Sequence, residues 1–326
     1  MNPKITVIIP IYNTQKYLKK CVNSILSQSM QNFELFLIDD GSTDGSDLIA
    51  KKFALKDKRI EYIWQENQGQ AVARNIGIKR ARGEYISFID SDDWIEPLML
   101  EEMISVLSKD GSDFVTCRLS FFYEQNPGKT DSIYGSEFKI DILSGESILS
   151  DALLGKNITS SSVNKVYRTS FLQTNSILYP IKVKNEDVLF IIKVASKAVK
   201  ASFLNKVYYH ALIREGSTTI KLTAEILNTT IYSLKLEENY LRENGFYEKH
   251  QTGHEIHYIM LINYLLVRAP ARVSDIKKWY SIIEQSDYYS YLKKNVFKIS
   301  IVHLICGIIC RFHLLCTLKP ISRKLY

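Results

Sequence analysis

Residues 83–97 read G-E-Y-I-S-F-I-D-S-D-D-W-I-E-P, and this stretch decides the fold of the N-terminal half. The apolar run 85–89 has the length of a buried strand and ends abruptly in an acidic cluster, Asp90, Asp92 and Asp93. Carboxylates at the end of a buried strand repel one another and lose hydration. A divalent cation such as Mg²⁺ or Mn²⁺, shared with a substrate phosphate, would compensate them. An acidic turn with Asp as a helix cap is the alternative.

Strand and helix patterns alternate around this cluster. A continuously apolar, β-branched run predicts a central strand at residues 4–12, and further strands are predicted at 33–38 and 60–64. Helices are predicted after them at about 18–26, 47–55 and 70–81. Pro97 suits the first turn of another helix. Such alternation predicts an α/β fold with right-handed crossovers and a mostly parallel sheet. Residues 224–268 have helical patterns.

Two further features would lie at the same edge of the sheet. Asp39 and Asp40 follow the second predicted strand, where a carboxylate can accept from a base or a ribose hydroxyl. A capping turn is the alternative for this loop. Arg74 lies one turn into a predicted helix, where a guanidinium suits a diphosphate, although a surface salt bridge is the commoner role of a lone arginine.

Four motifs occur in order: V-I-I-P-I-Y-N at 7–13, D-D-G-S-T-D-G-S at 39–46, N-Q-G-Q-A-V-A-R-N-I-G at 67–77 and G-E-Y-I-S-F-I-D-S-D-D at 83–93. Three more follow: S-V-N-K-V-Y-R-T-S-F-L at 162–172, N-E-D-V-L-F at 185–190 and Y-Y-H-A-L-I-R-E-G-S-T-T at 208–219. Together they resemble the family 2 inverting glycosyltransferases of bacterial surface-polysaccharide type. These have a GT-A-type, Rossmann-like fold and use nucleotide-diphosphate sugars.

The resemblance implies a donor site. At the nucleoside, Pro10, Tyr12 and Asn13 would border the base and ribose, and Asp40 would hold the nucleobase. At the diphosphate, Arg74 would lie near the diphosphate or sugar, and Arg214 and Ser217 would close over the diphosphate. Asp90 and Asp92 would form the D-x-D pair at ribose and metal, and Asp93 would reach toward the sugar. The implied cofactor is Mn²⁺ or Mg²⁺, with Asp92 as the closer ligand and Asp90 beside it.

The resemblance also implies a catalytic pair. Asp187 would be the base that takes the acceptor proton, and Glu186 would face the acceptor. Inverting transfer needs one such base while the hydroxyl oxygen attacks the anomeric carbon. Both residues also precede a helical apolar pattern, as acids of a first helical turn often do, and the two roles are compatible.

The resemblance leaves the acceptor open. The Q-x-x-R-W motif and membrane spans of processive synthases are missing from this sequence, which favours addition of one sugar to a glycan or lipid-linked acceptor. One alternative is a polyprenyl-phosphate sugar synthase. A non-catalytic, membrane-recruited binding subunit is another.

The net charge of +7 lies in the last residues, because residues 288–326 contain seven Lys or Arg and no Asp or Glu. This pattern disfavours a nucleic-acid partner, which would need charge on the folded domain. We expect a catalytic domain at 1–220, a helical region at 221–326 and a basic amphipathic tail at about 288–326. Because the N-terminus lacks a signal peptide, a cytoplasmic protein at the inner face of the plasma membrane is expected.

The apolar stretch 299–318 is the centre of the tail. It would lie in the interface of an anionic membrane, with Lys293, Lys294, Arg323 and Lys324 at the headgroups. A spanning helix, or packing on the catalytic domain or on a second copy in a homo-oligomer, are the alternatives. A zinc site formed by four side chains on one helical face is a further alternative to core packing: His303, Cys306, Cys310 and His313.

Overall fold

The computed structural model describes residues 2–125, 132–134, 137–183, 185–214, 223–268 and 273–311. The chain divides into two compact units. The first comprises Met1–Leu149, Asn157–Lys182 and Phe190–Glu215, and the second comprises Ser150–Lys156, Val183–Leu189 and Gly216–Tyr326.

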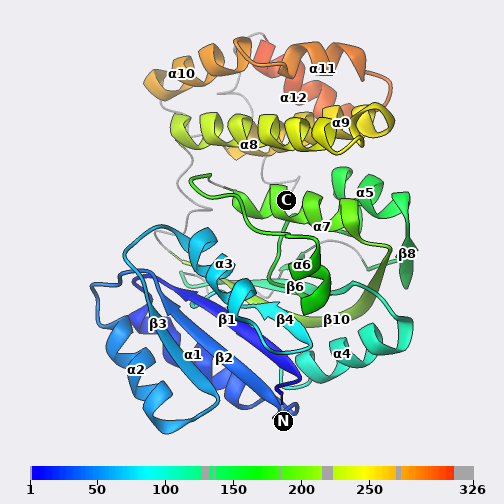
Figure 1. Cartoon of the computed structure of the whole chain (residues 1–326). Coiled ribbons are helices and arrows are strands. Elements are labelled where there is room, and N and C mark those ends of the chain that lie inside the picture. Colours follow the sequence, from blue (N-terminus) through cyan, green and yellow to red (C-terminus); the bar gives the residue numbers. More distant parts are fainter. Residues whose placement is uncertain are drawn as a thin grey trace. The chain divides into compact units, whose positions relative to one another are not determined.

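Parallel strands form the N-terminal part of the sheet in the first unit: β1 (Ile5–Ile11), β2 (Phe33–Asp39), β3 (Ile60–Trp64) and β4 (Tyr85–Phe88) (Figure 1). Their order is β3-β2-β1-β4. They are connected by α1 (Gln15–Leu26), α2 (Ser46–Lys56) and α3 (Gln70–Arg80). All residues of β1 and β2 are buried. The continuous apolar run of β1 predicts this burial, whereas β2 also buries the carboxylates of Glu34 and Asp39. The carboxyl ends of these strands therefore meet at one edge, which carries the predicted site loops.

A glycine on α3 allows that helix to lie against β1. A Cβ atom built at Gly77 would lie 2.6 Å from Cγ2 of Ile8, which is closer than real Cβ contacts. Only the missing side chain permits this approach. Arg74 lies one turn earlier on α3. The close packing of this helix therefore helps to place the Arg74 guanidinium beside Asp90 at the sheet edge.

The sheet continues from β4 as β9-β6-β10-β5. The elements of this part are β5 (Trp94–Ile95), α4 (Met99–Asp110), β6 (Phe114–Tyr123), β7 (Ser132–Tyr134), β8 (Ile142–Ser144), α5 (Glu146–Leu153), β9 (Lys165–Arg168), α6 (Thr169–Thr174), α7 (Glu186–Lys197) and β10 (Lys200–Ile213). β9 runs antiparallel to β4 and β6, whereas β6 and β10 are parallel. The predicted α/β class with a mostly parallel sheet is confirmed.

The helix predicted to begin at Pro97 begins two residues later. Residues 94–95 first pair with β10 as the short strand β5. Glu96 then accepts a hydrogen bond from the backbone of Met99, which closes a turn before α4 starts. The difference arises because β10 is distant in the sequence, so its pairing with residues 94–95 has no local signal.

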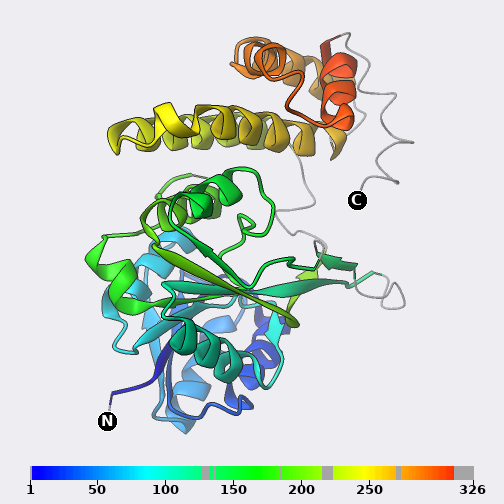
Figure 2. The same ribbon diagram turned by 90° about the vertical axis from the view of Figure 1, so that its right-hand side faces the viewer.

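The second unit is helical, as predicted for the C-terminal region. Its helices are α8 (Ala224–Glu243), α9 (Tyr247–Arg268), α10 (Val273–Glu284), α11 (Tyr288–Lys294) and α12 (Ile301–Arg311). α8 and α9 form a hairpin whose partners are the shorter helices α10, α11 and α12 (Figure 2). Trp279, Tyr258 and Ile262 are in the shared apolar core. In the described ranges no helix combines the length and the apolar character that crossing a bilayer requires.

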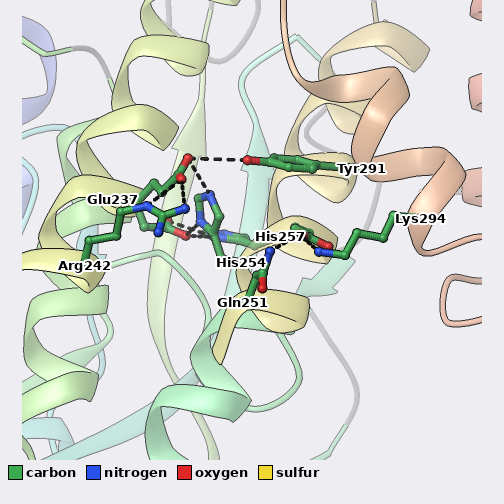
Figure 3. A network of polar contacts seen from close by, with 9 residues as sticks. Glu237, Arg242, Gln251, His254, His257, Tyr291 and Lys294 are labelled. Carbon is green, nitrogen blue, oxygen red and sulfur yellow. Dashed lines mark hydrogen bonds and ion pairs between the residues drawn. The ribbon is translucent and has the colours of Figure 1, made fainter. Parts of the chain in front are cut away.

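A buried carboxylate ties α8 to α9 (Figure 3). Glu237 accepts hydrogen bonds from Nδ1 of His254 at 2.7 Å and from Nδ1 of His257 at 3.0 Å, and all three residues are buried. Burial alone would raise the pKa of Glu237, but the charges and hydrogen bonds of the two histidines outweigh it and lower the pKa to about 2. The carboxylate therefore stays ionised inside the helical unit.

Replacing Glu237 by Gln is expected to destabilise the second unit by about 3 kcal/mol, because the histidines lose their buried counter-ion. Glu243→Gln is the matched control, because Glu243 is exposed at the end of the same helix and should contribute less than about 1 kcal/mol. Because the folded-state pKa of Glu237 is lowered, its stabilisation is present above the ordinary glutamate pKa and is lost as the pH falls toward about 2. Urea unfolding at neutral and acidic pH measures both effects. Equal stability of the two variants at neutral pH would contradict this role.

Candidate functional site

The acidic cluster lies at the carboxyl end of β4 and is held from β10. The backbone N–H of Asp90 donates to Oη of Tyr209 at 3.1 Å, and this hydroxyl donates to Oδ2 of Asp93 at 2.5 Å. The backbone N–H of Leu212 donates to Oδ1 of Asp93 at 2.8 Å. Both oxygens of Asp93 thus face β10, and the side chain is buried. Burial, and then repulsion from Asp90 and Asp92, raise the pKa of Asp93 well above its ordinary value.

The two remaining carboxylates of the cluster pair with arginines. Nη2 of Arg74, which is buried, donates to Oδ1 of Asp90 at 2.6 Å. Nε of Arg214, at the end of β10, donates to Oδ2 of Asp92 at 2.7 Å. Burial and the neighbouring Asp90 raise the pKa of Asp92, and Arg214 offsets only part of this effect. The structure therefore brings Arg74, Arg214 and the D-x-D pair together, and a further positive charge there would be favourable.

The residues fit a hard divalent cation such as Mg²⁺ or Mn²⁺. Their donors are carboxylate oxygens, and the Asp90 side chain remains 35% exposed at the sheet edge. Across the described ranges, no three or more His, Cys, Asp or Glu side chains are gathered into a ready metal site. Mg²⁺ needs no such cage, because one or two carboxylates, waters and substrate phosphates complete its shell.

The loop after β1 reaches the loop after β2. Oδ1 of Asn13 accepts from the backbone N–H of Thr43 at 2.9 Å, and the N–H of Asn13 donates to Oγ of Ser42 at 3.2 Å. Asn13 has a φ of 50°, a left-handed conformation that asparagine tolerates. Pro10 is buried within β1, whereas the ring of Tyr12 is half-exposed beside this loop. Of these residues, Tyr12 is the most exposed.

Asp40 organises a neighbouring loop. Its Oδ1 accepts from the backbone N–H of Gln68 at 2.8 Å and from the side-chain amide of Gln65, and its Oδ2 accepts from the N–H of Gly69 at 2.9 Å. Gly69 has a φ of 90°, which brings its N–H to this carboxylate. A carboxylate offers about four acceptor positions, so about one remains for a ligand.

Glu186 and Asp187 form the first turn of α7, and Glu186 is buried. Asn185 precedes them with a φ of 60°, and its side-chain amide donates to Oγ1 of Thr230 at 2.8 Å. Residues 183–189 belong to the second unit. The start of α7 is thus fixed to α8, which gives the acid pair a rigid support. Ser217 lies outside the described residues.

Tyr209 is the functional residue that sequence reasoning missed. It is fully buried, and its hydroxyl joins Asp90 to Asp93. Burial and the charge of Asp93 raise its pKa well above the usual range, so it remains a neutral donor. The hydroxyl of a tyrosine in a buried strand needs a hydrogen-bond partner, and this requirement could have identified Tyr209 from the sequence. The neighbouring His210 is a hydrogen-bonded histidine: its Nδ1 lies 2.7 Å from Oγ of Ser120, and its Nε2 lies 2.7 Å from Oε1 of Glu96.

Comparisons with known proteins identify the family and the fold of the chain. The family model described as "Glycosyl transferase family 2" matches residues 6–174, just over half of the chain. EpsH of Bacillus subtilis, described as a glycosyltransferase, is 31% identical over 252 residues, which cover 76% of this chain and 72% of EpsH.

Solved structures show the same fold. TarS 1-349 of Staphylococcus aureus superposes with a TM-score of 0.70 at 21% identity, covering 98% of this chain and 90% of that one. Its complex with UDP-GlcNAc has a TM-score of 0.65 at 22% identity, with the same coverage. The mannosyltransferase PcManGT of Pyrobaculum calidifontis, with GDP-Man and Mn²⁺, has a TM-score of 0.56 at 15% identity and covers 99% of this chain and 83% of that one.

Proposed function

Because the chain belongs to glycosyltransferase family 2, we propose that it is an inverting enzyme that transfers one hexosyl or hexosaminyl group from a nucleotide-diphosphate sugar to a hydroxyl of a glycan or lipid-linked acceptor. The observation that carries the proposal is the acidic cluster at the end of β4, with Arg74 and Arg214 on its carboxylates. A uridine diphosphate donor is favoured by the similarity to TarS, which binds UDP-GlcNAc. Surface-polysaccharide assembly is the proposed setting.

The donor would lie along the carboxyl edge of the sheet. Tyr12 covers the base, while Pro10 and Asn13 shape the loop beneath it. Asp40 holds the loop at residues 65–69 and offers its remaining acceptor position to the base. A Mn²⁺ or Mg²⁺ ion bound by Asp92 and Asp90 would neutralise charge on the departing diphosphate.

The arginines have a matching role. Arg74 and Arg214 now pair with the carboxylates of the acidic cluster, and each guanidinium can turn N–H groups toward phosphate oxygens. Ser217 is proposed to join Arg214 over the diphosphate. Asp93 is proposed to hold the acidic cluster on β10, because its two oxygens accept hydrogen bonds from the Tyr209 hydroxyl and the Leu212 backbone N–H. Its effect on the donor sugar would therefore pass through the position of Asp90 and Asp92.

The acceptor hydroxyl would give its proton to Asp187. A base at the first turn of a helix has a fixed direction, and the contact of Asn185 with Thr230 holds this turn in place. Glu186 would orient the acceptor. As the proton leaves, the oxygen forms its bond to the anomeric carbon while the bond from that carbon to the diphosphate oxygen breaks.

The protein is further proposed to work at the inner face of the plasma membrane, with its basic C-terminal tail on anionic lipid. The reason is the composition of residues 288–326, which carry seven basic and no acidic side chains. A lipid-linked acceptor would be presented at this surface.

A donor screen tests the proposed activity. Nucleotide release is measured with each common UDP-sugar and GDP-sugar, with Mn²⁺ or with a chelator. We expect one UDP-sugar to be consumed, and consumption to require the metal. If none of these donors releases its nucleotide, the non-catalytic binding subunit is favoured instead. If polyprenyl phosphate accelerates release and a glycan does not, the polyprenyl-phosphate sugar synthase is the better description.

A further inference from the structure

One side of α12 is covered by the second unit and the other is not. Cys306 is buried, and Gly307 lies so close to α11 that a Cβ atom there would be 2.3 Å from Cδ2 of Leu292. His303 contacts the side-chain amide of Asn263 on α9. These contacts fix which face of α12 points inward.

Large apolar side chains lie on the opposite face. Ile301, Ile305 and Ile308 follow the spacing i, i+4 and i+7, and they are 67%, 42% and 47% exposed. Phe297, in the turn between α11 and α12, is 99% exposed. Ile308 also lines a groove of about 470 Å³, together with Val296 and Leu304. Several large apolar side chains exposed on one helix face beside such a groove mark an interaction site.

The charges beside this surface are positive. Lys293 lines the groove and has no ion-pair partner in the described ranges. The Nζ of Lys298 donates to Oγ1 of Thr252 at 3.2 Å and has no ion-pair partner within the same ranges. Lys294 differs, because its Nζ lies 2.5 Å from Oε1 of the buried Glu255 (Figure 3). Lys293 and Lys298 are therefore available to a partner, whereas Lys294 holds α11 on α9.

The charge pattern selects the partner. No acidic residue follows Asp287 in the sequence, so a second copy of this face would bring lysine against lysine. The last residues of the chain, which include Lys319, Arg323 and Lys324, would meet the same repulsion. An anionic lipid bilayer offers both an apolar interior and negative phosphates at the required depth.

We propose that Phe297, Ile301, Ile305 and Ile308, with Lys293 and Lys298, form a docking surface for an anionic lipid bilayer. The apolar side chains enter the boundary between headgroups and acyl chains, and the two lysines contact lipid phosphates. This inference rests on the proposed function at a membrane and names its contact residues. It also removes Lys294 from the headgroup contacts predicted from the sequence.

The test is co-sedimentation of the full chain with vesicles of phosphatidylcholine, with or without phosphatidylglycerol. The wild type should pellet with the anionic vesicles only. Phe297→Ser combined with Ile301→Ser should weaken this partitioning at least tenfold, and Lys293→Glu combined with Lys298→Glu should do the same. The matched controls, Leu55→Ser and Lys52→Glu, change exposed residues on α2 and should partition as the wild type does.

Three outcomes would overturn the proposal: wild type that stays in solution with anionic vesicles, double variants that pellet like the wild type, or a dimer that Phe297→Ser dissociates. If the double variants pellet like the wild type, vesicle binding would be assigned to the residues after 311 alone. Nucleotide release without vesicles is measured on the same samples and should be equal in all of them. A wild type that binds vesicles but releases no nucleotide would contradict the proposed activity and leave the docking surface standing.

Discussion

Asp187→Asn is expected to lower the rate of sugar transfer by about 10³-fold or more, while the affinity for the nucleotide sugar stays within about twofold of the wild type. A positioned general base contributes about 10² to 10⁴ in rate. The amide has the size of the carboxylate but cannot take the acceptor proton. Because the residue lies in the first turn of α7, Asn can also replace its interaction with the helix terminus, so the fold should be retained.

Transfer is measured with the donor identified by the screen, and donor affinity by isothermal titration. Asp47→Asn is the matched control, because Asp47 is likewise an acid in a first helical turn, on α2, where it pairs with Lys51. This control should transfer sugar at the wild-type rate. Activity of Asp187→Asn within tenfold of the wild type would refute the base assignment. Loss of donor affinity together with activity would instead indicate a structural role.

The N-terminal half of the fold was readable because its signals are local. β1 is a continuous apolar or β-branched run, β2, β3 and β4 are mostly apolar or aromatic, and the loops at their ends carry polar residues, so the common edge followed from parallel topology. The pairing of β5 with β10 and the insertion of β9 between β4 and β6 join residues that are far apart in the sequence. No local pattern encodes such pairings.

The site shows a similar limit. Residue types predicted carboxylates and Arg74 at this edge, and the family resemblance added Arg214, but neither could show which carboxylate oxygens already accept hydrogen bonds. Asp93 and Asp40 have the same side chain, yet both oxygens of Asp93 are bonded from β10, whereas the loop at residues 65–69 takes all but about one acceptor position of Asp40. Lys293 and Lys294 are adjacent, and only the buried Glu255, on another helix, distinguishes them. These distinctions depend on tertiary contacts, which a single sequence does not contain.

Asp92→Asn should act on donor binding and on stability in opposite directions. Removing the carboxylate should weaken Mn²⁺-dependent binding of UDP by about 100-fold, the upper end of what even indirect partners of a metal contribute. In the metal-free protein the charged carboxylate of Asp92 destabilises the folded state, because burial and the neighbouring Asp90 disfavour its charged form and raise its pKa. An acid with a raised folded-state pKa makes the protein more stable at low pH, and this stability is lost as the pH rises through that pKa. Because Asn does not ionise, the Asp92→Asn variant does not lose this stability as the pH rises.

The melting temperature of metal-free Asp92→Asn should therefore be no lower than that of the wild type at mildly alkaline pH, while its UDP affinity falls. Arg214 loses a charged partner, but its N–H groups can donate to water or to the amide oxygen of Asn, because Arg214 is partly exposed. Titration of UDP with and without Mn²⁺, and thermal unfolding with a chelator, measure the two effects. Equal UDP affinity of the wild type with and without Mn²⁺ would show that Asp92 has no metal to hold. A large fall in melting temperature would show that its pairing with Arg214 supports the fold and outweighs the cost of burying its charge.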